Sequence, residues 1–149
     1  MKKAAVGAAS FIMALLIASC ATGKAMDAEG KRVTVPDSQQ NTGMEAVENG
    51  NTASISFDAN ASTGFSWDYL FDEDGVVEET SREYVAKKHP QGAVGYGGRQ
   101  LYVFKALKEG RTTATFIYRR PWDADSTIFT VNVCIAVDRE GNITITEIR

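Results

Sequence analysis

The sequence is poor in the residue types that carry out chemistry. Its 149 residues include one histidine, His89, and two cysteines, Cys20 and Cys134. Cys134 lies within an apolar stretch, where a thiol is usually inert packing and not a nucleophile. No spacing of cysteine, histidine or carboxylate side chains matches a metal site. This small number of reactive side chains argues against an enzyme and gives no reason to expect a metal or another cofactor.

A long apolar run is also missing. The apolar run from Ala4 to Ile17 has 14 residues, whereas a helix that crosses a bilayer needs about 20. Lys2 and Lys3 precede the run, and a basic start before a short apolar stretch is typical of a secretory signal. The letters LIASC, which end at Cys20, resemble the lipobox of bacterial lipoproteins. The alternative is an ordinary signal peptide in which Cys20 has no special role.

The lipobox resemblance implies that residues 1–19 are a lipoprotein signal peptide and that Cys20 is lipidated. A lipid anchor would hold the protein in the bacterial cell envelope, at the outer membrane or the cell surface, without spanning the membrane. Residues 20–149 carry 14 basic and 19 acidic side chains, which argues against nucleic acid as a partner. Once Cys20 is acylated, Cys134 has no partner for an internal disulfide, so the fold depends on its core.

Helical periodicity with recognisable caps is absent from the rest of the chain. Apolar and polar residues instead alternate with a period of two, which is the pattern of half-buried strands. In Thr127–Val137, for example, every second residue from Phe129 onward is apolar. Strands are predicted at Thr52–Asp58, Phe65–Leu70, Val76–Val85, Leu101–Leu107, Thr112–Tyr118 and Thr127–Val137, with further candidates at Lys31–Pro36 and in the tail after a turn at Glu140–Asn142.

Short strands with a turn signal roughly every ten residues are typical of an immunoglobulin-like β-sandwich. The sequence therefore predicts an all-β, antiparallel sandwich of about seven strands over residues 51–149, with Trp67 in the centre of the core. Residues 20–50 are polar and rich in Gly, Asn, Gln and Asp, so they are expected to form a tether that includes at most a first strand.

Three connections between the predicted strands have an unusual composition. Ala59–Gly64 is a polar turn in which Gly64 permits a positive φ. His89–Gly98 contains four glycines, but it lacks the ending and the following helix of a phosphate loop. The third connection places Trp122 beside arginine, the composition of a binding hot spot, although Trp122 could instead fold back over the sheet edge.

The motifs NASTGF, GYGG and RPW occur in this order in the three connections. They resemble the three motifs of the chagasin family of cysteine peptidase inhibitors, which read roughly NPTTGY or NPTTGF, GxGG and RPW. The resemblance extends from about Thr52 to Val137. It implies a reversible inhibitor of papain-like cysteine peptidases, with no catalysis, cofactor or small-molecule substrate of its own.

The resemblance also implies a peptidase-binding site on three loops, the first entering the catalytic cleft and the others gripping its sides. Connections at the same end of such a sandwich can converge. Ala61 stands where the family has proline, so the first loop is expected to be less rigid. The alternative is an adhesion or assembly module without inhibitory activity. The expected site residues are Asn60, Ser62, Thr63, Gly64 and Phe65 in the central wedge, Gly95, Tyr96, Gly97 and Gly98 on one flank, and Arg120, Pro121 and Trp122 on the other.

Overall fold

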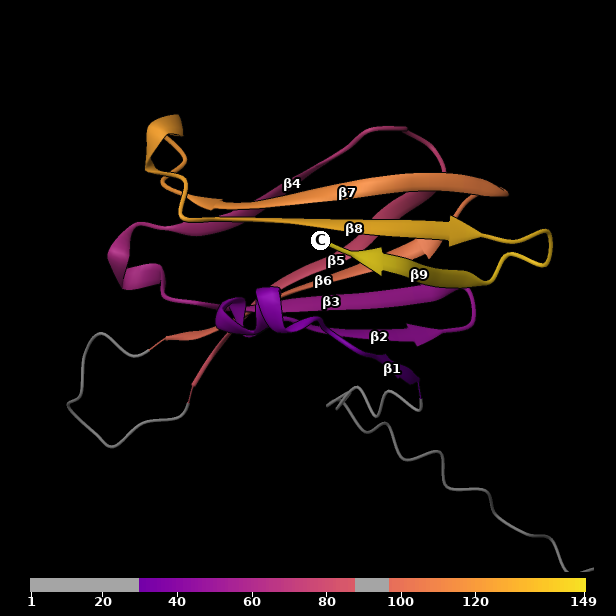
Figure 1. Ribbon diagram of the computed structural model, residues 1–149, viewed down its shortest axis with the longest axis horizontal. Helices are drawn as coiled ribbons and strands as arrows, with labels where there is room; N and C mark the ends of the chain where they lie inside the picture. The colour runs from indigo at the N-terminus through magenta and orange to yellow at the C-terminus, as the bar shows by residue number, and fades with distance from the viewer. Residues whose placement is uncertain (1–29, 88–96) are drawn as a thin grey trace, which may run out of the picture.

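The computed structural model describes residues 30–87 and 97–149, which form two antiparallel sheets packed face to face (Figure 1). All pairings within each sheet are antiparallel, as predicted. The first sheet contains, in spatial order, β1 (Lys31–Val33), β2 (Glu45–Asn49), β3 (Thr52–Ala59), β6 (Gly98–Ala106) and β5 (Val77–Ala86). The second contains β4 (Ser66–Phe71), β7 (Gly110–Arg119), β8 (Phe129–Val137) and β9 (Ile143–Ile148).

The all-β sandwich predicted from the sequence is therefore confirmed. The described residues contain nine strands, where about seven were expected from the sequence pattern. The additional strands come from the two ends of the chain. β9 pairs with β8 after a turn at Gly141, as the sequence of the tail had indicated.

The core lies between the two sheets, and the predicted alternation places its side chains there. Ile55 and Phe57 of β3 are fully buried, as are Val131 and Val133 of β8. Burying a side chain of this size stabilises the fold by roughly 1.5–3 kcal/mol relative to leaving it exposed. The two inner faces together supply enough apolar surface to hold the sheets against one another.

Trp67 lies at the centre of the core, as predicted, with 3% of its surface exposed. Its ring stacks on Phe57 with a centroid separation of 4.1 Å, and its indole N–H donates to the carbonyl oxygen of Asp58 at 2.9 Å. The buried hydroxyl of Tyr102 donates to the carbonyl oxygen of Trp67 at 2.7 Å. The polar groups of these large side chains are thus satisfied within the core.

The expectation of a tether over residues 20–50 is wrong for the part that the structure describes. β1, which falls within the predicted candidate Lys31–Pro36, and β2 extend the first sheet, and the short 3-10 helix η1 (Asp37–Thr42) connects them. Ala46 of β2 is buried in the core. Glu48 is buried as well, and its carboxylate accepts the backbone N–H of Ile145 at 2.7 Å and pairs with Lys31 at 3.2 Å. Cys20 and residues 21–29 lie outside the described residues.

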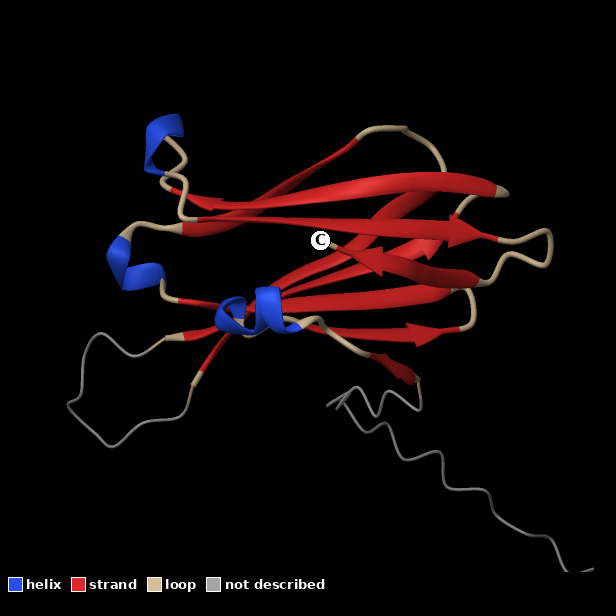
Figure 2. Cartoon of the chain, in the orientation of Figure 1, coloured by secondary structure: helices blue, strands red, loops and turns tan. Residues whose placement is uncertain are grey.

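The order of the strands determines which connections meet. Successive strands run in opposite directions, so the β1–β2, β3–β4, β5–β6 and β7–β8 connections lie toward the same end of the sandwich. Figure 2 shows the three short helices η1, η2 (Ala61–Thr63) and η3 (Ala124–Ser126) in blue on this side. None of the helices in residues 30–87 and 97–149 is long and apolar enough to cross a bilayer.

Candidate functional site

The β3–β4 connection is a compact turn that is held by its own polar groups. The side-chain oxygen of Asn60 accepts the backbone N–H of Ser62 at 3.2 Å and its hydroxyl at 2.7 Å. The hydroxyl of Thr63 donates to the carbonyl oxygen of Asn60 at 2.7 Å. Gly64 ends the turn with φ at 75°, a value that favours glycine. The predicted turn is confirmed, and Ala61, Ser62 and Thr63 are exposed at its tip.

Phe65 connects this turn to the core through a series of aromatic contacts. β4 begins at Ser66, so Phe65 belongs to the loop and not to the strand in which the sequence placed it. Its ring lies 5.5 Å from that of Tyr118, which stacks in turn on Trp67 at 5.0 Å. The hydroxyl of Tyr118 also accepts the backbone N–H of Asn60 at 3.3 Å. The base of the turn therefore rests on half-buried aromatic rings that stack on the buried Trp67.

The β7–β8 connection presents Trp122 to solvent. The hydroxyl of Ser126 accepts the backbone N–H of Arg120 at 2.9 Å and donates to the carbonyl oxygen of Asp123 at 2.6 Å, which closes the loop. Pro121 and Trp122 project from it, and Trp122 is 75% exposed. The alternative in which Trp122 folds back over the sheet edge is therefore excluded.

The loops contact one another. A Cβ atom placed on Gly64 would stand 3.0 Å from Cη2 of Trp122. A Cβ atom on Gly97, at the end of the β5–β6 connection, would stand 3.0 Å from the carbonyl oxygen of Ala59. The guanidinium of Arg120 lies over the ring of Phe65, 4.5 Å from its centroid. The first loop is thus packed between the other two connections.

A small group of charges connects the bases of the loops. The carboxylate of Asp58 forms ion pairs with Lys87, at 3.6 Å, and with Arg99, at 3.3 Å. Lys87 and Arg99 lie on either side of the β5–β6 connection, and the backbone N–H of Lys87 donates to the carbonyl oxygen of Gly97 at 3.1 Å. One carboxylate at the base of the first loop therefore links both ends of the second.

The family model described as Chagasin family peptidase inhibitor I42 matches residues 46–133 of this chain. The protein belongs to the chagasin family. Members of this family inhibit peptidases and are not enzymes. The matched segment contains the three loops, β3 to β7 and the first half of β8. The family assignment and the geometry therefore refer to the same part of the chain.

Two proteins of Entamoeba histolytica are similar to this chagasin-family chain in sequence. Amoebiasin-1 is 32% identical over 89 residues, which cover 58% of this chain and 84% of that protein. Amoebiasin-2 is 35% identical over 71 residues, which cover 46% of this chain and 55% of that protein. The crystal structure of the cysteine protease inhibitor EhICP2 from the same organism has 26% sequence identity and a TM-score of 0.51, and the match covers 57% of this chain and 77% of that one. This likeness confirms the predicted immunoglobulin-like fold class.

The site residues expected from the chagasin motifs come together where the structure describes them. Those of the first and third loops, with Gly97 and Gly98, lie at one end of the sandwich. Gly95 and Tyr96 lie outside the described residues. Sequence reasoning missed three residues that hold the chagasin loops in place, although the Tyr directly before the RRPW letters is a signal for one of them. These residues are Asp58, Tyr118 and Ser126.

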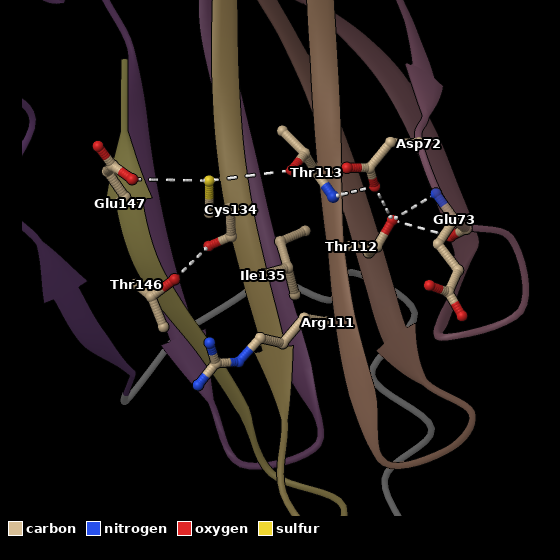
Figure 3. A pocket seen from close by; sticks show the side chains of 9 residues that line it. All are labelled: Asp72, Glu73, Arg111, Thr112, Thr113, Cys134, Ile135, Thr146 and Glu147. Atoms are coloured by element: carbon tan, nitrogen blue, oxygen red, sulfur yellow. Dashed lines mark hydrogen bonds between the residues drawn. The ribbon is translucent and has the colours of Figure 1, made fainter.

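Cys134 differs from its expected environment. Val133 and Ile135 point into the core, so Cys134 faces the outer surface of the second sheet, where it is half-buried. Figure 3 shows its sulfur among polar side chains that line a hollow of about 360 Å³, with Thr113 at 3.9 Å and Glu147 at 4.0 Å. Within residues 30–87 and 97–149, no group of histidine, cysteine and carboxylate side chains is arranged to hold a metal.

Proposed function

We propose that this protein is a reversible inhibitor of papain-like cysteine peptidases and that it has no catalytic activity of its own. The observation that carries the proposal is the packing of the first loop between Gly97 and Trp122, which gives one continuous edge at the end of the sandwich. Membership of a peptidase-inhibitor family supports it. So does the likeness to EhICP2, which is described as a cysteine protease inhibitor.

The geometry suits a narrow cleft. Thr63 stands at the exposed tip of the first loop, and Trp122 offers a large apolar surface beside it. Large aromatic side chains and arginine are the residues that most often dominate binding energy at protein interfaces. A stable complex usually buries about 800 Å² on each partner, which three adjacent loops can supply.

The first loop also has a conformation that resists cleavage. The carbonyl oxygen of Asn60 accepts the N–H of Thr63 at 3.2 Å, and that of Ala61 accepts the N–H of Gly64 at 3.3 Å. A peptidase attacks a bond that is held in an extended, aligned geometry. A closed turn presents its carbonyl groups in the wrong orientation, so we expect the loop to occupy the cleft without being hydrolysed.

The direct experiment is a titration of papain with the purified protein, with residual activity as the readout. We expect a stoichiometric loss of activity. Thr63→Arg places a bulky side chain at the tip of the wedge and is expected to abolish inhibition, whereas Thr144→Arg, on an exposed position of β9, is expected to leave it intact. Equal inhibition by both variants would remove the first loop from the site.

A second candidate function is a surface adhesion or assembly module with the same fold. Ala61 favours it, because the family motif has proline at this position of the wedge and the loss of proline makes ordering on binding more costly. The same titration separates the two functions. No loss of papain activity at micromolar inhibitor would support the module.

We propose in addition that Cys20 carries a lipid and anchors the protein in a bacterial cell envelope. The basis is the sequence of residues 1–20, which resembles a lipoprotein signal. A covalent lipid can hold a protein at a membrane surface without a membrane-spanning helix. Cys20→Ala is expected to release the protein from the membrane fraction of producing cells. Retention of this variant in that fraction would contradict the anchor.

A further inference from the structure

We propose that η1 and the glycine that follows it, residues 37–43, form a fourth contact element of the peptidase-binding edge. The inference rests on the proposed inhibitory function and extends it to a segment outside the family match, which begins at residue 46. The β1–β2 connection lies toward the same end of the sandwich as the three loops, because β1 runs toward that end, as β3, β5 and β7 do. The partner is the rim of the same peptidase cleft that the three loops fill.

η1 lies beside the first loop and beside the end of the β5–β6 connection. Asn41 and Thr42 of η1 line one shallow hollow of about 280 Å³ together with Asn60 and Gly97. Asn60 begins the wedge, and Gly97 ends the β5–β6 connection. A peptidase surface that contacts Asn60 from the side of the hollow would therefore also contact Asn41.

η1 is also fixed in position, so that a contact through it would need little ordering. The side chain of Thr42 is buried, and its hydroxyl donates to the carbonyl oxygen of Gln39 at 2.6 Å. The guanidinium of Arg99 donates to the carbonyl oxygen of Gly43 at 2.8 Å. A Cβ atom on Gly43 would collide with the side chain of Asp58, so η1 packs closely against the strand that leads into the wedge.

The exposed face of η1 has the chemistry of an interface rim. Its outward residues are polar and mostly uncharged, and such residues commonly surround the apolar centre of a protein interface. Trp122 would supply a large apolar contact on the opposite side of the wedge. η1 would therefore offer hydrogen bonds to polar groups on the cleft rim and discriminate between peptidases whose rims differ. The exposed residues are Asp37, Ser38, Gln40 and Asn41.

The test measures the dissociation of the full-length protein from immobilised papain. Asn41→Arg introduces bulk and charge on the proposed contact. Asn51→Arg introduces the same side chain in the β2–β3 turn, at the far end of the sandwich. We expect dissociation about tenfold faster for Asn41→Arg, because interface substitutions act mainly on the off-rate, and a change of less than about twofold for Asn51→Arg. Equal rates for Asn41→Arg and the unsubstituted protein would overturn the inference, and so would equal acceleration by both variants.

A second measurement keeps the inference testable if Asn41→Arg disturbs the fold. A photo-crosslinking amino acid at position 41 is expected to capture papain in the complex, and the same group at position 51 is not. Absence of the crosslink from position 41 while the variant still inhibits papain would overturn the inference. Failure of the unsubstituted protein to inhibit papain would instead overturn the proposed function itself, and the fourth contact with it.

Discussion

The ring of Trp122 packs against the backbone of Gly64, so closely that a Cβ atom on Gly64 would stand 3.0 Å from Cη2 and 3.4 Å from Cζ2. The two residues belong to different loops and lie far apart in the sequence. Gly64 has a positive φ of 75°, which turns the chain directly after the tip of the wedge. The same glycine therefore ends the first loop and provides the surface on which Trp122 of the third loop rests.

We expect Gly64→Ala to weaken inhibition by about tenfold. The left-handed conformation costs a residue with a Cβ atom about 1–2 kcal/mol, and the new methyl group would push the Trp122 ring away from the wedge. The measurements are the inhibition constant with papain and the free energy of unfolding in urea.

Gly75→Ala is the matched control for this variant. Gly75 has φ at 78°, and nothing lies within 4 Å of a Cβ atom placed on it, in the β4–β5 connection at the opposite end. Both variants are expected to lose a similar amount of stability, about 1 kcal/mol or more. If Gly75→Ala weakened inhibition as much as Gly64→Ala, the lower stability of the fold and not the Trp122 contact would be responsible.

Trp122→Ala is expected to reduce binding strongly and stability hardly at all. Trp122 is 75% exposed, so its removal takes little apolar surface out of the core. At an interface, a tryptophan of this kind often contributes about 2 kcal/mol or more, which corresponds to roughly a thirtyfold weaker inhibition constant. Leu107→Ala, which alters a 52% exposed apolar side chain after β6, is the control. A melting temperature that fell sharply for Trp122→Ala would place its main role in folding.

Ala61→Pro is expected to improve inhibition. Ala61 is exposed at the first position of η2, where proline fits helical geometry, and the preceding Asn60 has the extended conformation that proline requires, with φ at −135° and ψ at 95°. Proline would restrict the free loop by an amount worth about 0.4–1 kcal/mol. The inhibition constant is then expected to fall by roughly two- to fivefold. A higher constant would show that the wedge needs to adjust on binding.

Most of the sandwich could be predicted because the strands that form the core, such as β3, β7 and β8, each bury one face. In β8, Val131, Val133 and Ile135 alternate with partly exposed residues, and this period of two is visible in the sequence. β2 could not be predicted in the same way. Its buried Glu48 interrupts the apolar pattern, and its carboxylate is satisfied by the ammonium of Lys31, 17 residues away, and by the N–H of Ile145, 97 residues away. A contact of that kind leaves no local signal.

At the candidate site, too, features with a local sequence signal could be predicted and features that depend on distant contacts could not. The turn residues Asn60 and Gly64 were recognisable, because each has a local conformational role. The exposure of Trp122 was an expectation with an open alternative, and the structure was needed to decide it. η1 was missed as an ordered element, since its polar sequence resembles a linker until Arg99 is seen to bind Gly43. The roles of the loop residues in binding a peptidase stay predictions.

Asp58→Asn is expected to weaken inhibition by up to about fivefold at low salt. The substitution removes the charge that pairs with Lys87 and Arg99, and therefore loosens the β5–β6 connection relative to the wedge. These are exposed pairs, and such pairs contribute about 0.2–1 kcal/mol each. The effect is expected to disappear in 1 M salt, where screening reduces the range of the charges to about 3 Å.

Glu109→Gln is the control for Asp58→Asn. Glu109 forms an ion pair with Arg139 at 3.4 Å, and both residues lie at the end of the sandwich away from the loops. This pair is at least as exposed as the one between Asp58 and Lys87, so the two substitutions are expected to change the free energy of unfolding by similarly small amounts. Only Asp58→Asn is expected to change inhibition, because only Asp58 links two loops of the site. A loss of inhibition in Asp58→Asn that persisted in 1 M salt would contradict the role of the charge, because the Asn side chain keeps an oxygen that can accept the hydrogen bond from Arg99.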